Sequence, residues 1–421
     1  MAAPSKPRLA SNPRRLIAFE AARCAVFFLP VFYLYFEQRL AVDQVIALEA
    51  IYYLFGMVFE VPSGVASDRL GRKPTLVLAA ALQMIGALLV FTGDSFAVFA
   101  LGQALLASSW SFVSGTDTAL LYESLKATGR AGEQLRYEVA LSRAGLGALS
   151  AAAFLGGLLG TVQLKLAYLA TAALSGLAAW IALGLVEPPR AKFASSDPAP
   201  GPAAWFALLG RPIPRFALLA SICAMVLHHV PLEFLQPIVR ERLKELSPEF
   251  AGDTPWVSGA LLGSTMLLGA LATHLVPVLR AKLSPASVLL GSLALQGVVL
   301  TVLAFTVHPV LGTVLVLRSV PQALARPVLR TLLHPELTDR MRATWFSGQS
   351  LLGQGVFAAV LFGVAAWIGD LDQLGQGSLQ ALLGGFALLA GASVFGLAIL
   401  ARQLDRYPSG HQAAQDSEEN A

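Results

Sequence analysis

The 421-residue chain alternates between long apolar runs and short polar breaks. A helix needs about 20 mostly apolar residues to cross the hydrocarbon core of a bilayer, and many of these runs are that long. Dividing the sequence at charged or Pro/Gly-rich breaks predicts twelve membrane-spanning helices. They cover residues 16–37, 43–66, 75–93, 96–123, 136–160, 163–186, 213–239, 256–279, 285–306, 309–332, 343–368 and 379–401. The pattern predicts an all-α membrane protein.

The longest Pro-rich polar break within the apolar region is "EPPRAKFASSDPAPGP", which begins at Glu187. It separates the twelve predicted helices into two sets of six, and two six-helix halves are a known plan of transporters. The predicted parts are an N-terminal tail at 1–15, a bundle at 16–186, a linker at 187–212, a second bundle at 213–402 and a disordered C-terminal tail at 403–421.

Composition supports the membrane assignment and excludes several classes. The chain is 56% hydrophobic and 13% charged, whereas about a quarter of the residues of a soluble domain are charged. The net charge of +4 reflects basic loops rather than nucleic-acid binding. Cys24 and Cys223 lie in apolar runs, where a small hydrophobe is favoured over a disulfide or a metal ligand. No nucleotide-binding loop or hydrolase motif occurs, so we expect neither an enzyme nor a cofactor or metal.

Lys and Arg predict the orientation. With the N-terminus inside, 21 of the 30 fall in cytoplasmic segments, as the positive-inside rule requires. The external segments hold only Arg39, Lys165, Arg240, Arg242 and Lys244. The basic start is interpreted as a tail rather than a signal peptide, because the apolar stretch after it is too long. The prediction is a multi-pass protein of the inner or plasma membrane with both termini in the cytoplasm.

The turn between the second and third predicted helices carries the pattern G-x-x-x-D-R-x-G-R-K. Its residues are Gly64, Asp68, Arg69, Gly71, Arg72 and Lys73. This closely resembles the loop signature of the major facilitator superfamily. The stretches "SGTDTALLYESL" and "RATWFSGQSLLG" resemble helices four and eleven of its bacterial, twelve-helix efflux-type members. Gln103 stands where those members often have an arginine, and their Gly-Pro pattern of helix five is missing.

The residues of this turn suggest a conformational latch. Gly64 and Asp68 are four residues apart and face one side of a helix. Gly64 would allow a neighbouring helix to approach, and Asp68 could accept hydrogen bonds at that neighbour's N-terminus. The resemblance places the start of helix eleven, residues 342–347, at this position.

Arg69 or Arg72 could in turn pair with Glu123 at the end of the fourth helix and hold the cytoplasmic side closed. The alternative is positive-inside charge with helix capping, which explains Lys73. Glu60 lies about 12 Å before Asp68 along the helix, and it either extends the latch, titrates, or is a structural carboxylate satisfied near the membrane interface.

Ionisable residues within the membrane are functional candidates by default. The resemblance implies that helices one, four, seven and ten line a central cavity. Most such residues fall there, namely Glu20, Arg23, Asp117, His228, His229, Glu233, Arg318 and Arg326. By distance from their helix midpoints, Glu20, Arg23, Asp117 and Arg143 share one level and could form a neutral network. Protonation of Asp117 or Glu20 would then free an arginine, although a static structural network is the alternative.

The remaining candidates belong mainly to the second half. Arg318 is predicted near mid-membrane and either meets Glu233 or binds an anionic group of the substrate, while Arg326 is a gate residue or an anchor. Adjacent helical residues point about 100° apart, so His228 and His229 are not expected to share a metal. His228 either titrates or serves a structural role. Trp110 adds aromatic surface suited to lipophilic substrates, and the alternative is a packing role.

The predicted function is secondary active transport by alternating access, with proton-coupled export of a small amphipathic or drug-like molecule. Alternatives are uptake of a nutrient or organic anion, translocation of a lipid or lysolipid, and a membrane sensor or scaffold on a transporter fold. The expected partners are a small-molecule substrate, protons and the lipid bilayer, without nucleic acid, and the protein is expected to be a monomer.

Overall fold

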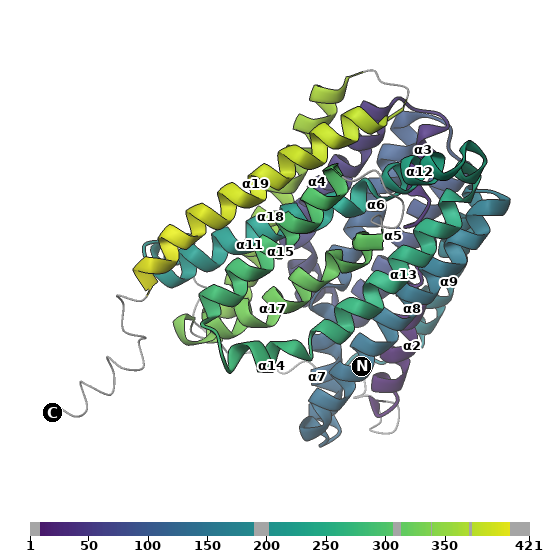
Figure 1. The fold of residues 1–421 in the computed structure, drawn as a ribbon. Helices are drawn as coiled ribbons and strands as arrows, with labels where there is room; N and C mark the ends of the chain where they lie inside the picture. The colour runs from purple at the N-terminus through teal and green to yellow at the C-terminus, as the bar shows by residue number, and fades with distance from the viewer. Residues whose placement is uncertain (1–8, 189–201, 306–312, 338, 370–372, 405–421) are drawn as a thin grey trace. The chain divides into compact units, whose positions relative to one another are not determined.

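The computed structural model describes residues 9–188, 202–305, 313–337, 339–369 and 373–404, and these form helices joined by short turns (Figure 1). Much of the predicted tails (1–15 and 403–421) and of the linker at 187–212 lies outside the described residues. The chain folds into two compact units. Unit 1 comprises Met1–Phe193, Leu235–Ser264 and Phe357–Leu374, and unit 2 comprises Ala194–Phe234, Thr265–Val356 and Gly375–Ala421.

Unit 1 contains the helices of residues 9–188 together with two elements from the second half of the chain. They are α2 (Asn12–Cys24), α3 (Phe32–Glu37), α4 (Val42–Leu70), α5 (Arg72–Thr92), α6 (Phe96–Val113), α7 (Thr116–Ala127), η1 (Ala131–Glu133), α8 (Gln134–Val162), α9 (Lys165–Leu183), α12 (Leu235–Leu246) and η2 (Pro248–Asp253). Within it α5 packs against both α6 and α9, and α2 packs against α8. Leu16, Phe19, Leu76 and Leu120 belong to its buried apolar core.

Unit 2 is built around α11 and α15. Its elements are α10 (Pro202–Leu209), α11 (Pro212–Glu233), α14 (Leu275–Arg280), α15 (Pro285–Phe305), η3 (Thr313–Ser319), α17 (Val320–Leu333), η4 (His334–Glu336) and α19 (Gln376–Leu404). Two long helices, α13 (Thr254–Ala272) and α18 (Asp339–Ile368), contain a boundary between the units, which therefore differ in extent from the two predicted bundles.

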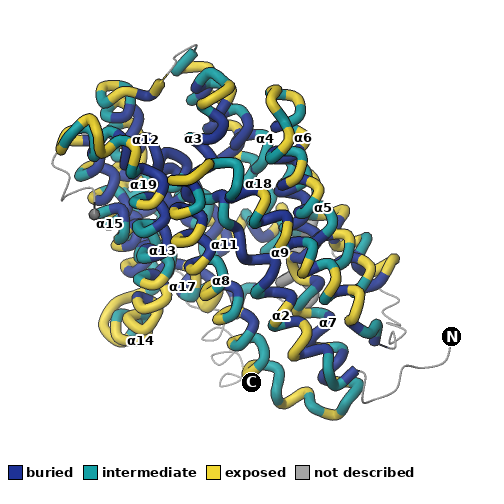
Figure 2. Tube along the Cα trace, turned by 90° about the vertical axis from the view of Figure 1, so that its right-hand side faces the viewer, coloured by how far each residue is buried: buried dark blue, intermediate teal, exposed yellow. Residues whose placement is uncertain are grey.

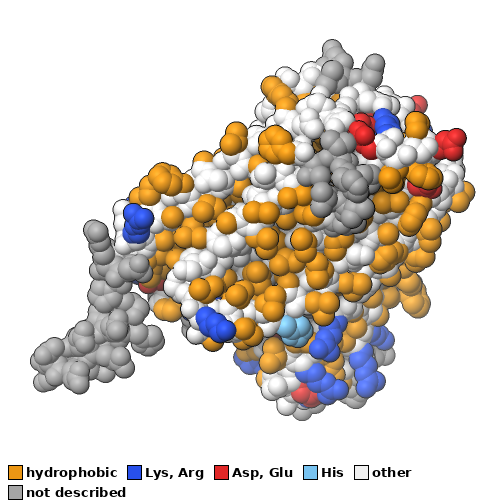
Figure 3. All heavy atoms as spheres, in the orientation of Figure 1, with side chains coloured by type: hydrophobic (Ala, Val, Ile, Leu, Met, Phe, Trp, Pro, Cys, Tyr) orange, Lys and Arg blue, Asp and Glu red, His pale blue; other side chains and the backbone are white. Residues whose placement is uncertain are grey.

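Ten helices of the described chain are long and apolar enough to cross a membrane. Buried and exposed positions alternate along them (Figure 2), and hydrophobic side chains spread over the face seen in Figure 3. A helix with an apolar exposed face is suited to lipid rather than water. The predicted all-α membrane fold is confirmed.

The two predicted spans that are not among these ten are interrupted. The span at 16–37 is split into α2 and α3 by an irregular stretch at 25–31, which contains Pro30. Proline cannot donate a backbone hydrogen bond, and it disfavours a helical residue before it. The span at 309–332 is described only from Thr313, where a 3-10 helix precedes α17.

Further breaks divide spans that were predicted to be continuous. The span at 96–123 is divided between α6 and α7 at Gly115, whose φ of 76° is left-handed. Breaks also separate α11 from α12 and α13 from α14. Sequence hydropathy does not detect them, because each break is only one or two residues long and lies within an otherwise apolar run. Broken helices expose backbone groups that need partners, so they mark the places where polar side chains gather.

Candidate functional site

The hairpin between α4 and α5 is organised around Arg72. Gly71, with φ of 113°, is the single residue between the two helices. The Arg72 guanidinium donates to Asp68 at 2.7 Å, to Ser67 at 2.8 Å and to Glu123 of α7 at 3.2 Å. The predicted pairing of the hairpin with Glu123 is therefore confirmed for Arg72. The four residues form what we call the Arg72 cluster.

Other members of the predicted hairpin are less constrained. The Asp68 side chain is 71% exposed, and Arg69 is also exposed. A Cβ placed on Gly64 would meet no atom within 4 Å, so no helix of unit 1 packs closely on it. The side chains of 342–344, in the predicted partner of Asp68, lie outside the described residues. Glu60 is half-buried in α4, which continues through Pro62 to Leu70.

Glu187, which was not among the predicted site residues, binds the N-terminus of α5. Its carboxylate accepts from the backbone N–H groups of Arg72 at 2.9 Å and Lys73 at 2.8 Å. These are N–H groups that the helix itself leaves unpaired, at its positive end. Asn12 holds the preceding residue, Val186, by hydrogen bonds to both of its backbone groups. The signal in the sequence was an acid at the end of the sixth helix, on the side predicted to carry the basic hairpin.

We expect Glu187→Gln to lower the free energy of unfolding by about 0.5–1 kcal/mol, because a neutral amide binds the positive helix end more weakly. Thermal unfolding in detergent measures this. Asp94→Asn is the matched control, since Asp94 is exposed near the opposite end of α5. Equal shifts for the two variants would contradict this role of Glu187.

The break in the first span contains a buried ion pair. Arg23 donates to both oxygens of Glu20, at 2.7 and 2.8 Å, and each residue is less than a tenth exposed. The Cys24 thiol also lies at hydrogen-bond distance from Glu20, at 3.3 Å. A Cβ on Gly145 of α8 would lie 3.0 Å from Glu20 Oε1, so the missing side chain lets α8 pack against the carboxylate.

Two further groups complete the surroundings of this pair. The Arg23 guanidinium stacks 4.6 Å from the ring centroid of Trp110, a cation–π contact. Asp117, on α7, is close enough for its charge to interact with those of Glu20 and Arg23. Arg143 is exposed and forms no ion pair within the described chain. Three of the four residues predicted to share one level thus lie together, and Arg143 is not part of the group.

Side chains from other helices satisfy the backbone of the break. Thr171 accepts from the N–H of Phe27 at 3.0 Å. Gln236, which is fully buried, accepts from the N–H of Tyr33 at 2.8 Å and donates to the carbonyl of Leu29 at 2.9 Å. A Cβ on Gly156 of α8 would lie 1.9 Å from the Phe27 carbonyl oxygen. These contacts fix an irregular segment that would otherwise carry unpaired polar groups in an apolar region.

We expect Gly156→Ala to cost more than about 1–3 kcal/mol of stability, because its methyl group would displace backbone rather than a flexible side chain. Gly147→Ala is the control on the same helix, since a Cβ there meets no atom within 4 Å. The control should be neutral or stabilising by up to about 1 kcal/mol. Melting temperatures in detergent compare them, and equal stability of the two variants would contradict the close contact at Phe27.

A second buried ion pair joins α3 to α12. Arg240 donates to both oxygens of Glu37, and one of these bonds measures 3.0 Å. Both side chains are at most a tenth exposed. Burial acts to lower the pKa of Arg240, but the hydrogen bonds to Glu37, the charge of Glu37 and other nearby acidic groups together outweigh it, and the pKa lies above its usual value. Neither residue was a predicted site residue, although their opposite charges lay in segments assigned to the same side of the membrane.

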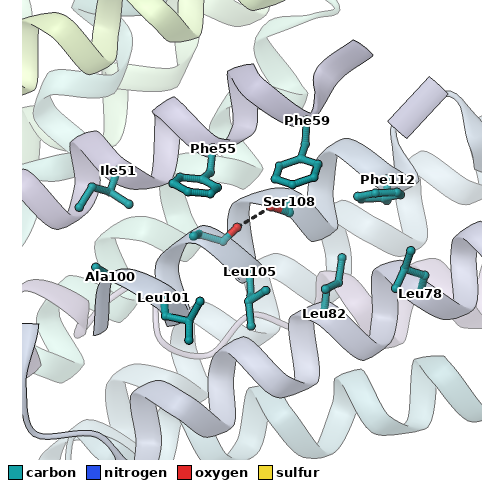
Figure 4. A pocket seen from close by; sticks show the side chains of 11 residues that line it. Ile51, Phe55, Phe59, Leu78, Leu82, Ala100, Leu101, Leu105, Ser108 and Phe112 are labelled. Atoms are coloured by element: carbon teal, nitrogen blue, oxygen red, sulfur yellow. Dashed lines mark hydrogen bonds between the residues drawn. The ribbon is translucent and has the colours of Figure 1, made fainter. Parts of the chain in front are cut away.

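Within unit 1, Gln103 also has a buried acidic partner. Its amide donates to Glu49 of α4 at 2.7 Å, and both residues are at most about a tenth exposed. The helices α4, α5 and α6 also line an open apolar pocket of about 510 Å³ (Figure 4). Phe55, Phe59 and Phe112 line it, and the Ser108 hydroxyl donates to the carbonyl of Ala104 on its own helix. The pocket therefore offers hydrocarbon surface and little polarity.

In unit 2, the predicted histidines lie in α11. His228 is buried, and its Nδ1 lies 3.1 Å from the carbonyl oxygen of Arg318 in η3. His229 Nδ1 lies 2.8 Å from the carbonyl of Met225, one turn earlier. The two rings are perpendicular, with an interplanar angle of 88°. No cluster of three or more metal-ligating side chains occurs among the described residues.

The other candidates of unit 2 differ in burial. Glu233 and Arg318 are buried, at 5% and 4% exposure, whereas Arg326 is exposed on α17. A guanidinium and a carboxylate at such depth require charged or polar partners. Arg326 is exposed on the surface of its own unit and does not require such a partner. The two arginines therefore differ in their need for one.

The fold and these polar groups define an α-helical, multi-pass membrane protein of the transporter class. The chain belongs to the Major Facilitator Superfamily, whose family model matches residues 16–344. No curated protein matches the chain significantly.

Solved structures with a similar fold are transporters of low sequence identity. A variant of the nucleoside transporter NupG has a TM-score of 0.75 at 15% identity, over 94% of this chain and 99% of that one. A variant of the peptide transporter POT has a TM-score of 0.72 at 15% identity, over 96% and 99%. An inward-facing bacterial homolog of the human lysosomal transporter Spinster has a TM-score of 0.63 at 16% identity, over 95% and 96%. At these identities the likeness concerns the fold.

Proposed function

We propose that the protein is a secondary active transporter that works by alternating access, and that Glu20, Arg23 and Asp117 couple it to protons. The observation that carries this proposal is the buried ion pair of Glu20 and Arg23 in the broken first span. Asp117 of α7 is close enough for its charge to interact with this pair. Buried ionisable groups are costly in a membrane. Two acids that face one arginine leave a net negative charge, which a proton would neutralise.

Proton uptake by this group would change its contacts. A proton on Glu20 removes the charge that holds the guanidinium, and Arg23 could then turn to Asp117. Trp110 keeps a favourable surface for the guanidinium during that exchange. Because Gly145 lies directly against the Glu20 carboxylate, a change in the pair alters the contact between α2 and α8. Protonation is thereby linked to helix packing.

Two further ion-pair groups would act as gates. In the proposed orientation, with both termini in the cytoplasm, the Arg72 cluster is the cytoplasmic latch and Glu37–Arg240 closes the external side. Both consist of oppositely charged groups from different helices. Ion pairs of this kind can form and break as the transporter alternates between its two states.

We propose export of a small, partly hydrophobic molecule. The apolar pocket beside Phe55 and the aromatic surface at Trp110 support a substrate with hydrocarbon character. The similar structures include transporters of nucleosides and of peptides, which makes both compound classes suitable test substrates.

The buried guanidinium of Arg318 favours a second candidate, uptake of an organic anion. A cation in a low-dielectric region attracts an anionic substrate strongly. If the protein takes up organic anions, Arg318→Gln should abolish their transport. If it exports partly hydrophobic molecules, Arg318→Gln should leave the transport of cationic compounds unchanged.

The experiment is transport in proteoliposomes under an imposed pH gradient. Ethidium, uridine, a dipeptide and benzoate serve as test compounds, with Asp117→Asn and Glu20→Gln beside the wild-type protein. We expect gradient-dependent movement of at least one compound by the wild type and its loss in both variants. Arg143→Gln is the control, because it removes an exposed charge outside the group. Transport that responds equally to all three substitutions, or that ignores the gradient, would contradict coupling through Glu20 and Asp117.

A further inference from the structure

Gln296 of α15 is a buried amide whose hydrogen-bonding groups have no partner in the described protein. The residue is 2% exposed, and neither Oε1 nor Nε2 forms a hydrogen bond there. Leaving a buried donor or acceptor unpaired costs about 1–3 kcal/mol, and such groups are rare in folded proteins. No residue of the proposed transport mechanism needs Gln296, so its burial requires a separate explanation.

Gln296 lines a small cavity in unit 2, enclosed by α11, α15 and α17. The cavity measures about 10 Å³, and His228, Ser292 and Gln322 are its other polar lining residues. That volume is roughly what one water molecule requires, and it is too small for a larger ligand. Leu293 and Pro321 form part of the apolar wall.

The polar groups around the cavity complement a water molecule. A carbonyl oxygen only accepts, so the contact with Arg318 places the hydrogen of His228 on Nδ1. In the neutral ring, Nε2 is then an acceptor. The Ser292 hydroxyl already donates to Val288 at 2.8 Å, which leaves its oxygen as an acceptor. Gln296 adds one acceptor and an N–H donor.

We propose that this cavity is a binding site for a single water molecule held by Gln296 and His228. The water donates to His228 Nε2 and Gln296 Oε1 and accepts from Gln296 Nε2. A metal ion fits less well, because it would require several oxygen ligands around it. Through His228 Nδ1, the water connects α15 to the backbone at Arg318 and so supports the segment that carries this buried arginine.

The test is X-ray radiolytic labelling of the full-length protein in lipid nanodiscs, where hydroxyl radicals formed from bound water modify adjacent side chains. We expect Leu293 to be modified well above Leu300, which is buried on the same helix away from the cavity. The excess at Leu293 should be lost in Gln296→Leu, which removes the amide that holds the water. If that variant does not fold, Gln296→Met removes the same groups with a flexible side chain.

The proposal would be overturned if Leu293 were modified no more than Leu300 in the wild-type protein. It would also be overturned if the greater modification of Leu293 persisted in Gln296→Leu. The melting temperature of Gln296→Leu is a second measurement, and it should change in opposite directions for a dry cavity and for a cavity that holds water. Removing an amide that has no partner should raise the melting temperature, whereas removing the partner of a bound water should lower it.

Discussion

Replacing Arg23 with leucine should lower the free energy of unfolding by about 3–5 kcal/mol, because it leaves the Glu20 carboxylate buried without its partner. Glu20 accepts two hydrogen bonds from Arg23, and the only other hydrogen-bonding group on its carboxylate in the described chain is the weakly polar Cys24 thiol. Asp117 would add repulsion, since its charge has the same sign. Chemical unfolding in detergent micelles measures the loss, and transport in proteoliposomes should also disappear.

The double variant Glu20→Gln with Arg23→Leu separates charge from packing. Replacing both charged partners of a buried pair by neutral ones is often close to neutral in stability. We therefore expect most of the lost stability to return and transport to remain absent. Arg143→Leu, which removes an exposed arginine, should cost less than about 0.5 kcal/mol. A double variant less stable than Arg23→Leu would show that the pair does not stabilise the protein through its charges.

The second large effect is expected at the Glu37–Arg240 pair. Glu37→Gln leaves the Arg240 guanidinium buried against a neutral amide, and losing one partner of such a pair costs about 2–5 kcal/mol. This loss of stability affects only the conformation in which residue 37 contacts Arg240, and not a conformation in which the pair is already separated. Since each 1.4 kcal/mol changes a ratio of states about tenfold, the conformational equilibrium should shift by at least about tenfold toward the state with this side open.

A cysteine at Val31 reports this shift. Val31 is fully buried at the end of the break, so a membrane-impermeant maleimide should react slowly with Val31→Cys after Cys24 and Cys223 are replaced. Adding Glu37→Gln should speed the reaction, and exchanging the charges by Glu37→Arg with Arg240→Glu should slow it again. Glu241→Gln is the control, because Glu241 pairs with Lys244. Labelling that is unchanged by Glu37→Gln would contradict a gate at this pair.

Hydropathy was sufficient to predict the apolar helices but not their breaks, and spacing indicated which charged residues lie at one level. Glu20 and Arg23 are three residues apart, so their common level could be read from the helical repeat. Predicting the pairing of Arg72 with Glu123 also required the membrane topology, because α5 and α7 belong to different parts of the sequence. These predictions depended on local geometry and on the side of the membrane, both of which leave patterns in the chain.

Contacts that depend on three-dimensional packing could not be predicted in this way. Gln236 binds the backbone at Tyr33 and Leu29, and nothing near Gln236 in the sequence indicates a break some two hundred residues earlier. Gly156 resembles many other glycines until the Phe27 carbonyl is placed against it. Arg143 was assigned by depth alone, but depth does not specify which face of a helix a side chain occupies. Helix rotation and breaks are the missing information.

Coupling of transport to protons is tested most directly by measuring proton movement driven by the substrate. Wild-type protein is reconstituted with a pH-sensitive dye inside the liposomes, and the compound identified as a substrate is added without an imposed pH gradient. We expect the substrate to drive a change in internal pH in the wild type and in Arg143→Gln, and none in Glu20→Gln or Asp117→Asn. Substrate that crosses the membrane in the wild type with no change in internal pH would contradict this coupling.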